Sequence, residues 1–230
     1  DIARLNGETP VVRLLEKYGA RGSAVAPAAR TPRPASTVRV AVERSLPLLQ
    51  RVDAGFAKGA GCVSCHDNSM EAMAYGLAAK RGFRIDVAGA ATQVKFNGEQ
   101  LTAARDRLHE GYYVAAVGDM FSDFTLGYQL VGLHAQGHRP DVNTDAAVML
   151  VRSRQRPNGE WAYPRADTRP PIGLDYVSQT ALSMRALQLY APKLQADECA
   201  RVVGRASGLL ARARAEGHED RAWRVTGLAW

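Results

Sequence analysis

Segments with apolar residues at helical spacing, each closed by a Gly or a Pro, follow one another along most of this chain. Their ends read "AKRGF", "HAQGHRP", "LYAPKL" and "RAEGHED". Apolar residues spaced three and four apart indicate amphipathic helices, which a Gly or a Pro ends. Alternation of apolar and polar residues, which would indicate strands, is scarce. The sequence therefore predicts an all-α protein with about eight helices.

The expected helices group into pairs, in which a helix, a turn and a second helix are followed by Gly or Pro. The pairs repeat loosely about every 45 to 55 residues, a period typical of helical-pair arrays. The weakest helical signal lies in residues 84–97, before a helix expected near 98–109. Pro47 is expected to kink the helix that starts near residue 38. Such an array is either an open solenoid or a closed α/α barrel.

Residues 1–20 differ from the rest. The segment "VVRLLEKYGA", with Gly19 as a helix C-cap, follows a polar turn "NGETP". It resembles the second half of an ankyrin repeat and covers about half of one repeat of roughly 33 residues. The resemblance implies further repeats upstream and a protein partner bound through them, since half a repeat is not stable alone. Residues 21–37, rich in Ala, Pro and Arg, are expected to be a linker, and 38–230 a second domain.

A second resemblance rests on the segment "QRPNGEW". Gln155, Gly159 and Trp161 fit the pattern Q-x-x-x-G-x-W and follow an apolar helical segment. This looks like the QW motif of squalene–hopene cyclases and related terpenoid cyclases. In that family the turn joins an outer and an inner helix of an α/α toroid, with the Gln capping a helix end and the Gly allowing the reversal. The resemblance covers residues 38–230 and implies an α/α toroid, as a partial or incomplete barrel of helical hairpins.

The resemblance implies the fold more strongly than the activity. The acid motif D-x-D-D of squalene cyclases and the magnesium motif D-D-x-x-D of class I synthases do not occur in the 230 residues. Inner-helix starts face the cavity of a toroid, so Asp175 and Tyr176 could line a pocket; Asp175 could equally be a helix cap. The chain begins without Met and stops at "TGLAW", within an apolar segment, so we expect a fragment with a truncated toroid.

The segment "GCVSCHDN" lies in the turn of the first pair and carries chemistry of its own. Cys62, Cys65 and His66 match C-x-x-C-H, the attachment pattern of c-type haem. Two thiols on one short turn can add across the two haem vinyl groups, and the adjacent imidazole can bind the iron. The pattern predicts covalent haem c. A sixth iron ligand would come from elsewhere, and the candidates are His134, His138, Met120 and His109.

Other interpretations of this segment remain open. A redox dithiol would lack the βαβ setting of thioredoxin-like proteins. A zinc site would need further ligands, and no second C-x-x-C occurs in the sequence. A disulfide or packed thiols could simply stiffen the turn. Three functions follow: a haem domain in electron transfer or redox sensing with a redox partner, a terpenoid-cyclase-like enzyme, or a non-catalytic protein-binding scaffold.

Charge and hydropathy limit the kinds of binding partner that we expect. The net charge is +7, but the arginines are spread along predicted helices rather than clustered, so we do not expect nucleic-acid binding. No run approaches the roughly 18 to 20 apolar residues of a membrane span. Haem attachment would require export, for example to the bacterial periplasm, although no targeting signal lies within these residues.

Overall fold

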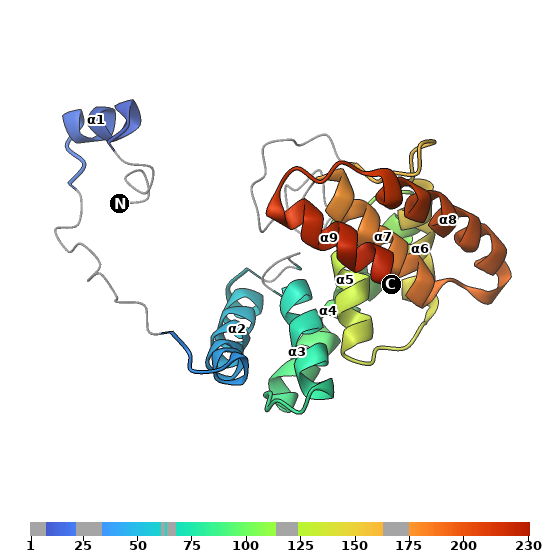
Figure 1. Cartoon of the computed structure of the whole chain (residues 1–230), viewed down its shortest axis with the longest axis horizontal. Coiled ribbons are helices and arrows are strands. Elements are labelled where there is room, and N and C mark those ends of the chain that lie inside the picture. Colours follow the sequence, from blue (N-terminus) through green and yellow to red (C-terminus); the bar gives the residue numbers. More distant parts are fainter. Residues whose placement is uncertain (1–7, 22–33, 61–62, 64–67, 114–123, 163–174) are drawn as a thin grey trace. The chain divides into compact units, whose positions relative to one another are not determined.

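The computed structural model describes residues 8–21, 34–60, 63, 68–113, 124–162 and 175–230. These residues form nine α-helices and no strand, so the all-α prediction is confirmed (Figure 1). The helices are α1 (Pro10–Lys17), α2 (Val38–Ala60), α3 (Met70–Lys80), α4 (Val87–His109), α5 (Thr125–Ala135), α6 (Val142–Ser153), α7 (Tyr176–Tyr190), α8 (Ala196–Arg212) and α9 (His218–Ala229).

The chain divides into two compact units, Asp1–Ala41 and Val42–Trp230. In the first unit, α1 starts at a Pro, and the Thr9 hydroxyl accepts a hydrogen bond from the Val12 amide. Gly19 ends this helix with a φ of +86°, a backbone conformation that favours glycine. The helix predicted there is therefore present.

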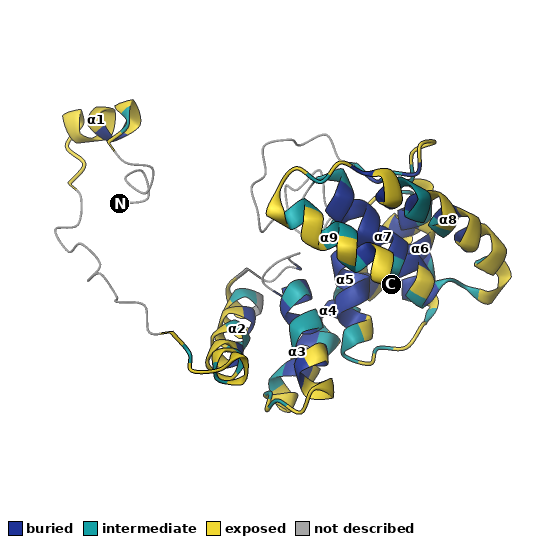
Figure 2. Ribbon diagram, in the orientation of Figure 1, coloured by how far each residue is buried: buried dark blue, intermediate teal, exposed yellow. Residues whose placement is uncertain are grey.

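In the second unit the helices form two rows. Helices α3, α5, α7 and α9 pack side by side in that order, and we call them the inner row. Helices α4, α6 and α8 form the outer row, in which α4 packs on α6 and α8 packs against α7 and α9. Figure 2 shows that α5 and α7 are buried over nearly their whole length, whereas α8 buries one face. The main hydrophobic core lies between the rows.

Glycines occupy the contacts within the inner row. A Cβ atom on Gly132 of α5 would lie 2.8 Å from the carbonyl oxygen of Ser69, directly before α3. A Cβ on Gly227 of α9 would lie 2.8 Å from the Cβ of Ala181 in α7. Real Cβ atoms do not approach other atoms so closely, so these helices reach their spacing only because the side chain is absent.

Two elements differ from the prediction. Helix α4 begins at Val87 rather than near residue 98, because the Asp86 side chain accepts a hydrogen bond from the Gly89 amide at 3.0 Å. Gln50 of α2 holds the backbone of Asp86 in place, at 3.1 and 3.3 Å. Helix α9 was not predicted, so the expected number of helices was one too low. Pro47 lies inside α2.

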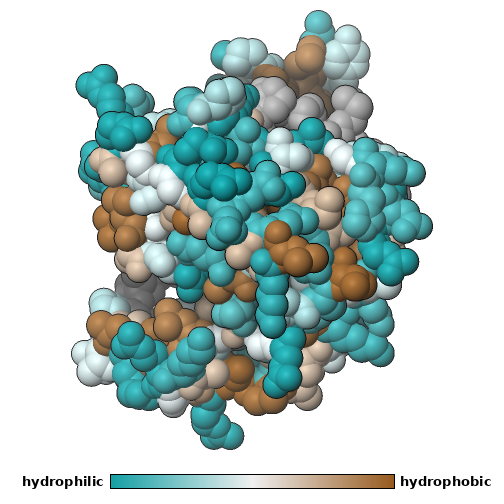
Figure 3. Space-filling model, turned by 90° about the vertical axis from the view of Figure 1, so that its right-hand side faces the viewer, coloured by the Kyte–Doolittle hydropathy of each residue, from teal (hydrophilic) through white to brown (hydrophobic). Residues whose placement is uncertain are grey.

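The described part of the chain contains no helix that is both long and apolar enough to cross a bilayer. On the face shown in Figure 3, hydrophilic residues predominate and hydrophobic ones are scattered among them. Scattered apolar residues are ordinary on a protein surface, so that face suggests no particular partner.

Candidate functional site

A cavity of about 580 Å³ lies between the two ends of the inner row. Its volume is within the ~300–1,000 Å³ of pockets that hold small molecules and cofactors. Helix α3 contributes Met70 and Met73. The other lining residues belong to helix α9 or directly follow it, and they are His218, Glu219, Ala222, Trp223, Thr226 and Trp230. The lining is mainly apolar, with one imidazole, one carboxyl group and one hydroxyl. His218 and Ala222 are exposed, so the cavity opens to solvent.

The aromatic side of the cavity is held by the neighbouring inner helices. The ring of Trp223 meets that of Tyr128 in α5 edge-on, with centroids 6.1 Å apart. Trp223 and Trp230 lie 6.2 Å apart, and the guanidinium of Arg185 in α7 lies 5.5 Å from the Trp230 ring. Burial lowers the pKa of Arg185. A cation thus stands beside an apolar, aromatic wall.

This wall was not predicted, because helix α9 was not predicted. The signal was present in "HEDRAWRVTGLAW". Trp223, Gly227 and Trp230 follow one another at helical spacing and share a face. The acidic residues Glu219 and Asp220 lie in the first turn, where the helix dipole favours negative charge. Asp220 also accepts hydrogen bonds from the amides of Glu216 and Gly217.

Cys62, Cys65 and His66 lie outside the described residues, as does Met120. Two described neighbours show where the motif joins the core. Val63 is 4% exposed and belongs to the main core, against which Met70, Met73, Trp223 and Trp230 also pack. Asn68 is fully buried and lies two residues before Met70. Val63, within the motif, and Asn68, two residues after it, are therefore both buried.

The other candidate iron ligands among the described residues do not line the cavity. His134 lies in the last turn of α5, edge-on to Tyr190 with centroids 5.9 Å apart. His138 lies beyond the end of α5, so the two histidines do not share a helix. His109 lies in the last turn of α4.

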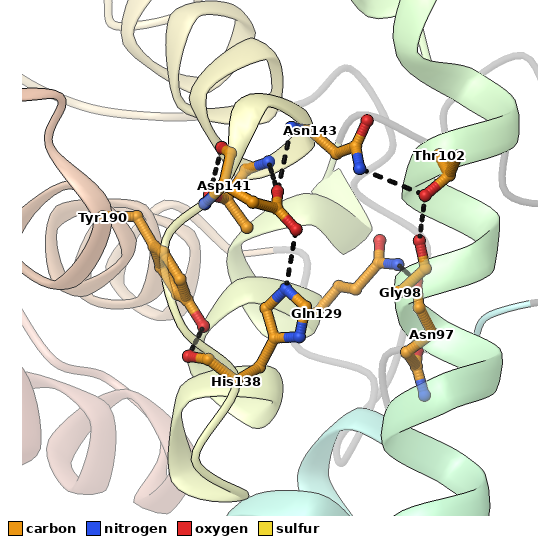
Figure 4. Close-up of polar contacts among 9 residues, drawn as sticks. Asn97, Gly98, Thr102, Gln129, His138, Asp141, Asn143 and Tyr190 are labelled. Carbon is orange, nitrogen blue, oxygen red and sulfur yellow. Dashed lines mark hydrogen bonds and ion pairs between the residues drawn. The ribbon is translucent and has the colours of Figure 1, made fainter.

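His138 belongs to a polar network that joins helices (Figure 4). Its Nε2 lies 3.3 Å from Oδ2 of Asp141, and its carbonyl accepts a hydrogen bond from the Tyr190 hydroxyl at 3.0 Å. Asp141 also caps α6 through a capping box. Nearby, Asn143 donates to Thr102 of α4 at 3.1 Å. These contacts give the network a structural role at the start of α6.

The QW-like turn connects α6 to two other helices. The amide nitrogen of Gln155 donates to the carbonyls of Gly159, at 3.1 Å, and Val202 in α8, at 2.9 Å. The Gln155 side-chain oxygen accepts two hydrogen bonds from Arg205, at 3.0 and 2.6 Å. Gly159 has a φ of +95°, and a Cβ there would lie 2.7 Å from the Arg205 carbonyl oxygen. Both conditions require glycine.

Trp161 completes this turn. It is fully buried, and its indole nitrogen donates to the Val151 carbonyl in the last turn of α6 at 2.6 Å. Its backbone amide donates to the Thr180 hydroxyl of α7 at 3.1 Å. The Val151 carbonyl also accepts a hydrogen bond from the Arg154 amide at 3.2 Å, so the indole is its second donor. Together with the contacts of Gln155, these hydrogen bonds tie α6, α7 and α8 together.

The remaining residues that the sequence singled out have structural partners. Asp175 accepts hydrogen bonds from the amides of Val177 and Ser178, at 2.8 and 2.9 Å, and so caps α7. The Tyr176 hydroxyl donates to the Arg214 carbonyl at 3.4 Å. Neither residue lines the cavity. The capping interpretation of Asp175 fits these contacts.

Comparison of the chain with protein-family models, with curated proteins and with solved structures finds no match.

Proposed function

We propose that residues 38–230 form a haem c domain that acts in electron transfer or redox sensing. Cys62 and Cys65 would attach the haem through thioether bonds, and His66 would bind its iron. The observation that carries the proposal is the apolar cavity of about 580 Å³ whose wall begins at Met70, four residues after His66. A C-x-x-C-H motif needs room for the cofactor beside it, and this cavity offers that room.

The described residues of this segment support the proposal. Val63 stands between the two cysteines, and Asn68 follows His66 by two residues. Both residues are buried, and Val63 belongs to the core against which Met70 packs.

The chemistry of the lining also fits. A bound haem would supply a one-electron iron couple. Met73 and the two tryptophans of α9 would cover its apolar faces and keep water from the iron, which shifts the reduction potential. Arg185, beside Trp230, is a cation within reach of this wall and could balance the negative charge of haem carboxylates.

We also propose that the two rows are part of an α/α toroid, as the QW-like turn suggests. Helices α3 and α9 are the two ends of the inner row, yet both line one cavity. Tyr128 of α5 also reaches Trp223 of α9, past the intervening α7. A row that curves around a centre would have both properties.

The N-terminal unit suggests a protein partner. Val11, Leu14 and Leu15 of α1 are exposed, although they form its apolar stripe. An ankyrin helix buries such a stripe against neighbouring repeats. We propose that α1 ends an ankyrin array that binds a protein, which could be the redox partner of the haem domain.

The aromatic cavity favours one other function, a terpenoid-cyclase-like enzyme. Tryptophan faces stabilise positive charge, and Glu219 would be the acid that protonates a hydrocarbon substrate. Incubation of the Cys62→Ser/Cys65→Ser variant with squalene tests this. A cyclised product that disappears in the additional Glu219→Gln variant would favour the enzyme over the haem protein.

The haem proposal itself is tested by export of the protein to the bacterial periplasm together with c-type maturation factors. We expect a denatured gel band that stains for haem, because thioether bonds survive denaturation. The Cys62→Ser/Cys65→Ser variant should give an unstained band of equal protein amount. An unstained wild-type band would refute the proposal.

A further inference from the structure

A second, much smaller cavity of about 10 Å³ lies between the start of α3, α4 and α5. A cavity must offer about 10–15 Å³ to hold one water molecule, so this one has room for a single small guest. Its lining is unusually polar for the interior of a helical protein. The polar residues that line it are Asn68, Ser69, Gln93, Asn97 and Gln129.

Two oxygen atoms of this lining are buried and have no hydrogen-bond partner within the part of the chain that the structure describes. They are Oε1 of Gln93 and Oδ1 of Asn97, on residues that are 7% and 5% exposed. A buried acceptor normally has a partner, because leaving it unpaired costs the free energy of removing it from water. Both atoms therefore call for a donor from inside the cavity.

The neighbouring amides do not supply that donor. The side-chain nitrogen of Asn97 donates to the Gln93 carbonyl at 2.9 Å, which fixes the orientation of this amide and leaves its oxygen over. The side-chain nitrogen of Gln129 donates to the Asn97 carbonyl at 3.0 Å (Figure 4). The Gln129 side-chain oxygen accepts from the Tyr113 hydroxyl at 2.9 Å. The amide of Gln129 is thus engaged at both ends.

We propose that this cavity binds one water molecule, which donates its two hydrogens to Oε1 of Gln93 and Oδ1 of Asn97. Water has the right size and the right number of donors. A metal cation fits less well, because the described residues that line the cavity include no carboxyl group to balance its charge. A buried ion without a counter-charge costs far more free energy than the immobilisation of one water.

The water links elements that the larger cavity depends on. Gln93 and Asn97 belong to α4 of the outer row, whereas Asn68 and Ser69 directly precede α3. Polar groups of these two residues lie beside the same water, whose lone pairs can accept from them. The water therefore bridges α4 and the residues that lead into Met70. This inference concerns the fold and does not depend on the proposed haem function.

The test combines a high-resolution crystal structure with oxygen-17 magnetic relaxation dispersion, which counts long-lived internal waters in solution. We expect one electron-density peak at hydrogen-bond distance from both oxygen atoms. Gln93→Met keeps the length of the side chain but removes its acceptor, so this variant should hold one long-lived water fewer than the wild type. Gln100→Met is the matched control on the same helix, outside the cavity lining, and should keep the wild-type count.

A wild-type crystal structure with no peak in the cavity would overturn the proposal, whether or not the Gln93→Met variant folds. An equal water count in the wild type and in folded Gln93→Met would do so as well. A peak with contacts shorter than hydrogen bonds would assign a cation instead of water. In that case the melting temperature should rise with Na⁺ or K⁺, but not with tetramethylammonium at equal ionic strength.

Discussion

Gly132 of α5 lies so close to Ser69 that a Cβ atom on it would be 2.8 Å from the Ser69 carbonyl oxygen. Ser69 directly precedes Met70, the first residue of the cavity wall. The segment that links the cysteine motif to α3 is thus pressed against the inner row. The position of Met70, on the α3 side of the cavity, depends on this packing.

This contact predicts the effect of Gly132→Ala. A backbone carbonyl cannot move away as the end of a flexible side chain can, so the variant should lose roughly 1–3 kcal/mol of unfolding free energy. Gly204→Ala in α8 is the control, since a Cβ there would meet nothing within 4 Å. That change should raise the stability by about 0.5–1 kcal/mol. Urea unfolding measures the unfolding free energy of both variants. Equal changes in the two variants would contradict the close packing of Gly132 on Ser69.

The QW-like turn predicts a second pair of variants. Gly159 and Gly137 both have positive φ, +95° and +84°. An Ala at either position meets a backbone strain of roughly 1–2 kcal/mol. At Gly159 the new Cβ would also lie 2.7 Å from the Arg205 carbonyl oxygen, whereas at Gly137 it meets nothing within 4 Å. Gly159→Ala should therefore lower the melting temperature distinctly more than Gly137→Ala. A similar loss in both would mean that the turn does not pack on α8.

Trp161→Phe tests the hydrogen bond within that turn. The change keeps the ring buried but leaves the Val151 carbonyl without the indole donor at 2.6 Å. We expect a loss of about 0.5–1.5 kcal/mol in chemical unfolding, because one hydrogen bond is lost while the carbonyl keeps the one from the Arg154 amide. Trp223→Phe is the comparison, because Trp223 is half-buried and makes ring contacts. The prediction fails if Trp161→Phe is as stable as the wild type.

The pH dependence of stability should contain a contribution from His134. Burial, followed by the nearby cations Arg185 and Lys80, lowers its pKa below the ordinary value of 6.5. The unfolded chain then takes up this proton at a higher pH than the folded protein does. The contribution is present above pH 6.5 and is lost as the pH falls toward the lowered pKa.

His134→Gln removes this proton uptake. Denaturant midpoints measured between pH 8 and pH 5 should therefore fall less steeply in the variant than in the wild type. A steeper fall of the midpoint in the variant would mean that folding raises the pKa of His134 instead of lowering it.

Local patterns made part of this fold predictable. The all-α class, the cap at Asp175 and the turn around Gly159 depend on residues close together in sequence, and all are present. Helix α4 began earlier than predicted because its cap at Asp86 is held by Gln50, which is 36 residues distant. A contact between residues so far apart in sequence cannot be predicted from a local pattern.

The cavity could not be predicted for the same reason. Its walls come from α3 and α9, which are separated by more than a hundred residues, and the close approach of α9 to α7 depends on Gly227 and Ala181. The cysteine motif suggested a cofactor from its chemistry alone. The cavity itself became visible only when the helices were packed.

The most direct test of the central claim is a count of free thiols, combined with the intact mass of the denatured protein. The chain has three cysteines, and Cys199 is free and buried. Burial raises the pKa of its thiol, so it should react only after unfolding.

If haem is bound through Cys62 and Cys65, the unfolded protein should show one reactive thiol with or without reductant, and a mass increased by one haem. Three thiols after reduction, with the mass of the bare chain, would contradict the haem proposal and favour a disulfide or a dithiol at the motif.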